Sequence, residues 1–85
     1  MPNPKPTIDR VAALLVVCLG CSIADASNPE SNPADDLGMD SLDSLEILIE
    51  IENHFNIIIA DAEAEAALAK TVGDIVKLVD SKLTQ

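Results

Sequence analysis

Ser41 is the residue whose type and setting best suit chemistry, because it stands among Asp40, Leu42 and Asp43. A serine hydroxyl becomes a catalytic nucleophile only when a neighbouring base, most often histidine, activates it. No histidine with an orienting acid lies near Ser41, and no Gly-x-Ser-x-Gly turn surrounds it. A hydrolase of that kind is therefore not expected. The remaining roles are a helix cap or a hydroxyl that receives a covalently attached group.

The same residues fit the start of a helix. Asp40 or Ser41 can act as the N-cap and Asp43 as the acid of a capping box, an arrangement that stabilises a helix by about 1 kcal/mol. A phosphodiester on Ser41 would use the same geometry, since free backbone N–H groups and the helix dipole attract negative charge. From these four residues alone, an ordinary cap is the stronger interpretation.

A helix over residues 41–55 is predicted to position Ser41, and three strips of side chains run along it. The core strip contains Ile47, Leu48, Ile51 and Phe55. The acidic strip contains Asp43, Glu46 and Glu50, and the apolar strip beside it contains Leu42, Leu45 and Ile49. Two interpretations stay open for the apolar strip: it docks a partner, oriented by the carboxylates, or it packs under the preceding loop.

Three further helices are predicted from the spacing of apolar residues. The first covers residues 7–19, with Thr7 as N-cap, Gly20 as stop and an inward face of Ile8, Val11, Ala12, Leu15 and Leu19. A short one covers residues 61–69 and is capped by Asp61. The last begins with a capping box of Thr71 and Asp74 and turns inward Val72, Ile75, Val76, Val79 and Leu83.

The predicted fold is all-α: a four-helix bundle with a short third helix and a long loop over residues 21–40. Ile23 and Leu37 are expected to anchor that loop, and residues 57–59 to form an extended link. We expect one domain over residues 1–85, with a flexible lead-in over residues 1–6 and the bundle over residues 7–83. Phe55 is the only aromatic residue, so the core must be aliphatic.

The charge is strongly one-sided. The chain has a net charge of −10, and residues 11–69 contain twelve carboxylates but no Lys or Arg. Such a field opposes binding to nucleic acids and to anionic membrane surfaces. It favours association with a basic protein surface, although acidic side chains also serve solubility alone.

Cys18 and Cys21 are too few for a disulfide framework or a zinc site, so we expect reduced, mostly buried thiols in a cytoplasmic protein. One alternative is a bacterial lipoprotein signal, since an apolar run over residues 11–19 precedes Gly20-Cys21. Asp9 and Arg10 directly before the run, and Cys18 where a leucine is usual, argue against it.

The region around Ser41 also resembles a known family. The ordered segment is Asp36-Leu37-Gly38-Met39-Asp40-Ser41-Leu42-Asp43, followed by Glu46, Glu52 and Phe55. It resembles the phosphopantetheine attachment region of acyl carrier proteins, and the similarity extends over about residues 7–83. Asp-Ser-Leu alone is weak support, whereas the whole ordered set with its spacing is specific.

The resemblance implies a non-catalytic monomeric carrier with 4′-phosphopantetheine, donated by coenzyme A, on Ser41. It implies as partners a phosphopantetheinyl transferase and the acyl-loading, synthase or acyltransferase enzymes of fatty acid, lipid or polyketide biosynthesis, through basic docking patches. The expected recognition residues are Asp36, Asp40, Leu42, Asp43, Leu45, Glu46, Ile49 and Glu50.

Some positions depart from the housekeeping fatty-acid type and indicate a specialised carrier. Glu50 stands where that type usually has Ala, and Ala60 stands where Pro is usual. A peptidyl carrier is the near alternative, although such carriers are usually less acidic and often have Gly or His where this chain has Met39. An unmodified acidic helical adaptor is the other alternative.

Overall fold

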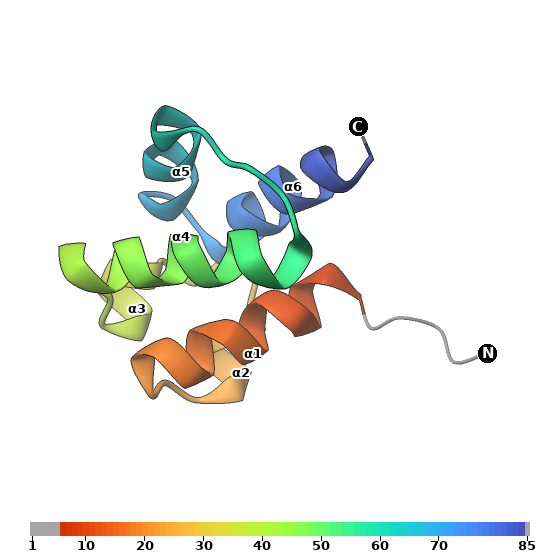
Figure 1. Cartoon of the computed structure of the whole chain (residues 1–85). Helices are drawn as coiled ribbons and strands as arrows, with labels where there is room; N and C mark the ends of the chain where they lie inside the picture. Colours follow the sequence, from red (N-terminus) through yellow and green to blue (C-terminus); the bar gives the residue numbers. More distant parts are fainter. Residues whose placement is uncertain (1–5, 85) are drawn as a thin grey trace.

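The computed structural model describes residues 6–84, so residues 1–5 of the lead-in expected over residues 1–6 lie outside the described part. Six helices follow one another: α1 (Thr7–Leu19), α2 (Ile23–Ala26), α3 (Pro33–Leu37), α4 (Ser41–Phe55), α5 (Asp61–Leu68) and α6 (Val72–Leu83). Figure 1 shows α4 crossing the molecule between α1 on one side and the α5–α6 pair on the other. The predicted all-α bundle is confirmed, with two additional short helices.

The core is aliphatic, as the composition requires. Most side chains with no exposed surface come from α1, α4 and α6, and they include Leu15, Ile47 and Val79. Phe55 closes one end of the core, with the Arg10 guanidinium carbon 4.3 Å from its ring centroid. The inward face predicted for residues 41–55 is confirmed, although Leu48 is only half-buried.

The inward position predicted for Leu83 is wrong, because this side chain is 42% exposed. Leu83 is the last residue of α6, so no following turn covers it. The other residues expected to face inward on α6 are buried or half-buried.

The connection over residues 20–40 is more ordered than the predicted loop, because it contains α2 and α3. Gly20 ends α1 in the left-handed conformation, at φ 69°, as expected for the stop residue. Leu37 is buried, which confirms it as an anchor, whereas Ile23 is 56% exposed and does not anchor the chain. The small Ala26 takes the buried position on α2 and lets this helix approach α1 closely, which leaves Ile23 at the edge.

The same connection is joined to the start of α6 by backbone hydrogen bonds. The Val72 N–H donates to the Ser31 carbonyl at 2.9 Å, and the Gly73 N–H donates to the Pro29 carbonyl at 2.8 Å. These are N–H groups of a first helical turn, which have no acceptor within their own helix. Gly73 suits this close approach, since a Cβ there would lie 3.0 Å from the Pro29 carbonyl oxygen.

Two helix starts differ from the prediction by one residue. Pro6, not Thr7, is the N-cap of α1, and the Thr7 hydroxyl instead donates to a carboxylate oxygen of Asp80 on α6. Ala60, not Asp61, is the N-cap of α5. Ala60 has no side-chain acceptor, and the Glu63 carboxylate accepts the Ala60 N–H at 3.3 Å.

Thr71 is the N-cap of α6, as predicted, but Asp74 completes no capping box, because its carboxylate accepts the Thr71 hydroxyl and not the Thr71 N–H. The Asp74 N–H donates to Thr71 Oγ1 at 3.3 Å, and that hydroxyl donates to Asp74 Oδ2 at 2.8 Å. The hydroxyl bond lowers the pKa of the Asp74 carboxyl. Lys82 joins α6 to α5 through a 2.9 Å ion pair with Glu63, and its hydrogen bond lowers the pKa of that carboxyl.

α1 is an integral part of the bundle. Its Val11, Ala12 and Leu15 have no exposed surface, so cleavage before Cys21 would remove part of the core. This burial argues against the lipoprotein alternative. In residues 6–84, no helix combines the length and apolar character needed to cross a membrane.

Candidate functional site

A capping box fixes the start of α4 and leaves Ser41 out of it. Asp40 is the N-cap: its Oδ1 accepts the Asp43 N–H at 2.8 Å, and Asp43 Oδ2 accepts the Asp40 N–H at 3.2 Å. Of the two N-cap candidates, the structure therefore selects Asp40. Ser41 is the first helical residue, and its side chain is exposed and makes no hydrogen bond within residues 6–84. The cap and a modification of Ser41 therefore do not compete.

The surroundings of Ser41 favour the binding of an anion at its hydroxyl over activation of the serine as a catalytic nucleophile. The capping box uses two N–H groups, while those of Ser41 and Leu42 have no acceptor among the described residues. These donors and the positive end of the α4 dipole favour a phosphate on Ser41 Oγ. His54, the only histidine, lies thirteen residues along α4, which is about 20 Å at a rise of 1.5 Å per residue. It is too far away to activate the serine.

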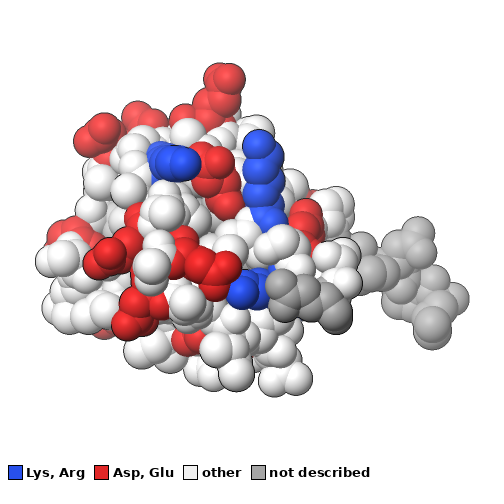
Figure 2. Space-filling view, turned by 90° about the horizontal axis from the view of Figure 1, so that it is seen from above, with Lys and Arg blue, Asp and Glu red and all other residues white. Residues whose placement is uncertain are grey.

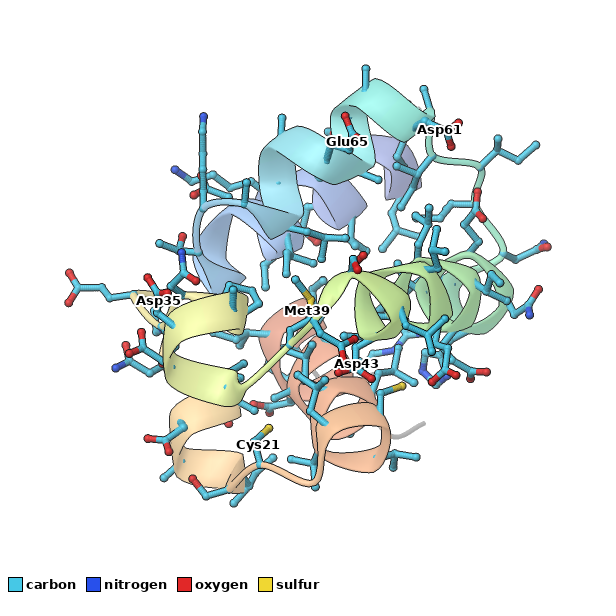
Figure 3. The ribbon with its side chains drawn as sticks, turned by 90° about the vertical axis from the view of Figure 1, so that its left-hand side faces the viewer. Cys21, Asp35, Met39, Asp43, Asp61 and Glu65 are labelled. Atoms are coloured by element: carbon cyan, nitrogen blue, oxygen red, sulfur yellow. The ribbon has the colours of Figure 1, made fainter. Side chains whose placement is uncertain are left out.

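A pocket of about 580 Å³ lies beside Ser41, between the start of α4 and α5. Figure 3 shows Met39 beside the start of α4, with Asp61 and Glu65 on α5. The apolar part of the lining comes from α3, from the link between α3 and α4, from α4 and from α5 with its C-cap. These residues are Ala34, Met39, Leu45, Leu48, Ala64, Leu68 and Ala69. The pocket has room for an extended aliphatic group attached at Ser41.

The apolar strip of α4 is exposed rather than packed under the loop. Leu42, Leu45 and Ile49 have exposed fractions of 66%, 59% and 54%. Two of the three also line hollows on opposite sides of this strip. Leu45 lines the pocket beside Ser41, whereas Ile49 lines a second cleft on the side of α1, and Leu42 lines neither.

The acidic strip of α4 lies next to the C-terminal half of α1. Burial is the largest cause that raises the pKa of the Cys18 thiol, followed by the carboxylates of Glu50, Glu46 and Asp43. Cys18 and Cys21 are free thiols, but they are only half-buried rather than mostly buried. Figure 2 shows carboxylates spread over the face seen from above, with few Lys or Arg side chains among them.

Asp36 is placed differently from the other expected recognition residues. It lies on α3, where its Oδ2 accepts the Asn32 N–H at 2.7 Å. The Asn32 side chain in turn accepts the Asp35 N–H at 2.9 Å. Asp36 thus helps to cap a short helix.

Sequence reasoning missed the residues that other elements bring to α4. Asp61, Ala64, Glu65 and Leu68 reach the Ser41 pocket from α5, and Val17 reaches Ile49 from α1. The spacing of Ala64 and Leu68 is a helical signal for an inward face. No comparable signal distinguishes Val17 on a helix that is apolar nearly all round.

Residues 6–79 match the model of a family described as "Phosphopantetheine attachment site". The matched region spans α1 to α5 and most of α6, with Ser41 inside it.

Proposed function

Because the chain belongs to the phosphopantetheine-attachment family, whose members carry covalent 4′-phosphopantetheine, we propose that it is an acyl carrier protein with Ser41 as the attachment residue. The observation that carries this assignment is the exposed Ser41 hydroxyl at the start of α4, left free because Asp40 makes the cap. The role is that of a carrier: Ser41 holds a group and supplies no catalysis.

The attachment reaction follows from the donor, coenzyme A. Ser41 Oγ attacks the phosphorus that bears the pantetheine, and the P–O bond to 3′,5′-ADP breaks as the new phosphodiester forms. The hydroxyl proton passes to a base of the transferase, since His54 lies about 20 Å away along α4 and the neighbouring Asp40 and Asp43 carboxylates accept the N–H groups of the cap. When bound, the arm supplies a terminal thiol that holds the acyl group as a thioester. The pocket beside Ser41 offers an apolar surface to that group.

Basic patches on the transferase and on the acyl-handling enzymes are the proposed docking partners. In this proposal the carboxylates Glu46 and Glu50 orient the partner, and the exposed Leu42 and Ile49 add apolar contact. The proposal also retains Asp36, Asp40, Asp43 and Leu45 as recognition residues. The net charge of −10 and Met39 before Asp40 favour an acyl over a peptidyl carrier.

The test is enzymatic modification of the purified chain. Incubation with coenzyme A and a phosphopantetheinyl transferase of broad specificity should increase the intact mass by one phosphopantetheine. The modified chain should then accept an acyl group from a fatty-acyl ligase and no amino acid from an adenylating enzyme. An unchanged mass with an active transferase contradicts the carrier role, whereas loading by the amino-acid enzyme alone assigns a peptidyl carrier.

Charge reversal at Glu46 and Glu50 should slow modification. Both carboxylates are exposed and neither takes part in the cap, so Glu46→Lys with Glu50→Lys changes the field without disturbing the start of α4. We expect kcat/KM of the transferase to fall roughly tenfold or more at low salt, and the deficit to shrink at high salt because ions screen the attraction.

The matched control is Asp25→Lys with Glu30→Lys, which reverses the charge of two exposed residues outside α4. It makes the same change in net charge as the α4 double variant. Equal deficits in the two double variants would mean that only total charge matters and that α4 has no special docking role.

A further inference from the structure

The side chain of Asn32 joins two parts of the chain that lie far apart in the sequence. Its Nδ2 donates to the Lys70 carbonyl at 2.8 Å and, at the longer distance of 3.4 Å, to the Ala69 carbonyl. The same side chain caps α3, because its Oδ1 accepts the Asp35 N–H at 2.9 Å. In Figure 3, α3 with Asp35 lies next to the segment that joins α5 to α6. One amide group thus ties the end of α5 to the start of α3.

The end of α5 depends on this contact. The last carbonyl groups of a helix have no N–H partner within the helix, and a glycine in the left-handed conformation often supplies one. α5 ends instead at Ala69, in the right-handed conformation. Within residues 6–84, no donor other than Asn32 reaches the Ala69 and Lys70 carbonyls.

The two segments that Asn32 joins also border the pocket beside Ser41. Ala34, two residues after Asn32, and Ala69, whose carbonyl Asn32 binds, both line this pocket. α5 packs mainly against α6, and the pocket separates it from the start of α4. The backbone bonds from the connection hold the start of α6 and not the end of α5. At this end of the pocket, the position of α5 relative to Ser41 therefore depends on Asn32.

We propose that Asn32 is a positioning residue that sets how far α5 can move away from α4, and thereby how widely the pocket beside Ser41 opens. When the amide contact breaks, the end of α5 loses its tie to α3 and the pocket opens toward water. An aliphatic acyl group in the pocket then loses part of its cover. This role toward the cargo rests on the proposed carrier function, whereas the tie between α3 and α5 does not.

Two substitutions remove the amide donor and keep the cap of α3. Asn32→Asp has the same size and retains an oxygen for the Asp35 N–H, but its carboxylate has no N–H to donate. Asn32→Ser is neutral, is also a good N-cap, and is too short to reach the two carbonyls. An effect that both variants share therefore comes from the lost donor and not from an added charge. Ser22→Ala is the matched control, because it removes a 3.1 Å side-chain hydrogen bond that caps α2, which does not line the pocket.

Hydrogen exchange of the unmodified chain, followed by NMR, measures the freedom of α5. Both Asn32 variants should exchange the amide hydrogens of residues 64–69 about threefold faster than the wild type or more, with those of residues 44–55 in α4 unchanged. Ser22→Ala should leave α5 at the wild-type rate. Unchanged exchange in α5 for both Asn32 variants overturns the proposal. An equal rise in α4 and α5 also overturns it, because Asn32 would then only stabilise the whole chain.

Cleavage of the loaded chain by hydroxylamine measures how well the pocket covers the cargo. A phosphopantetheinyl transferase of broad specificity loads the chain from octanoyl- or acetyl-coenzyme A, since a longer aliphatic group gains more from an apolar pocket. Both Asn32 variants should lose octanoyl about threefold faster than the wild type and acetyl at the wild-type rate. Equal loss of octanoyl from the wild type and both variants overturns the role in the pocket. If Ser41 gains no phosphopantetheine, the carrier role is contradicted, and the exchange rates still decide whether Asn32 holds α5.

Discussion

Ser41→Ala should abolish phosphopantetheine attachment, with no residual mass gain even after long incubation with excess transferase. Only the Ser41 hydroxyl can form the phosphodiester at this position, and alanine removes the oxygen that must attack phosphorus. Since Asp40 makes the cap, the substitution leaves both bonds of the capping box in place. The loss should therefore occur without a loss of stability, and alanine is itself a good helix former.

Ser44→Ala is the matched control for this experiment. Ser44 lies one turn further along α4, is half-buried, and donates its hydroxyl to the Ser41 carbonyl at 2.7 Å. We expect the Ser44→Ala variant to gain phosphopantetheine at nearly the wild-type rate. Intact mass spectrometry of both variants, with peptide mapping of the wild type, checks the position. A full mass gain on Ser41→Ala would move the attachment site elsewhere and overturn the assignment of Ser41.

The sequence predicted α4 in its full extent because several signals agree there. Asp40 and Asp43 cap it, apolar residues recur at helical spacing, and Phe55 ends it before Asn56 adopts the left-handed conformation. The family resemblance had the same source, and the family match confirms it. The attachment role of Ser41 stays a prediction until its modification is measured.

The connection between α1 and α4 was harder to predict, because long-range hydrogen bonds shape it. Ser31 is buried although it is polar, since its carbonyl accepts the Val72 N–H of α6. The residue types around Ser31 do not indicate that a backbone N–H about forty residues later in the chain donates to the Ser31 carbonyl. The same limit applies to the cleft at Val17, which exists only because α1 packs against α4.

The largest expected loss of stability comes from Leu15→Ala. Leu15 has no exposed surface and lies in the face of α1 that packs against α4 and α6. Removing a buried leucine typically costs about 2–5 kcal/mol, through lost burial and the cavity that remains. The free energy of unfolding of a small domain is about 5–15 kcal/mol in total, so the variant should lose a large part of it.

Val17→Ala, two residues further on the same helix, separates packing from helix formation. Val17 is 82% exposed, so its truncation opens no cavity, and alanine has the higher helix propensity. We expect an unchanged or slightly higher free energy of unfolding, measured for both variants by urea denaturation followed by circular dichroism. A loss below about 1 kcal/mol for Leu15→Ala would be too small for a fully buried leucine. It would show that α1 does not pack in the core as described. In that case the cleft between α1 and α4 would lose its structural basis, while the assignment of Ser41, which depends on the start of α4, would stand.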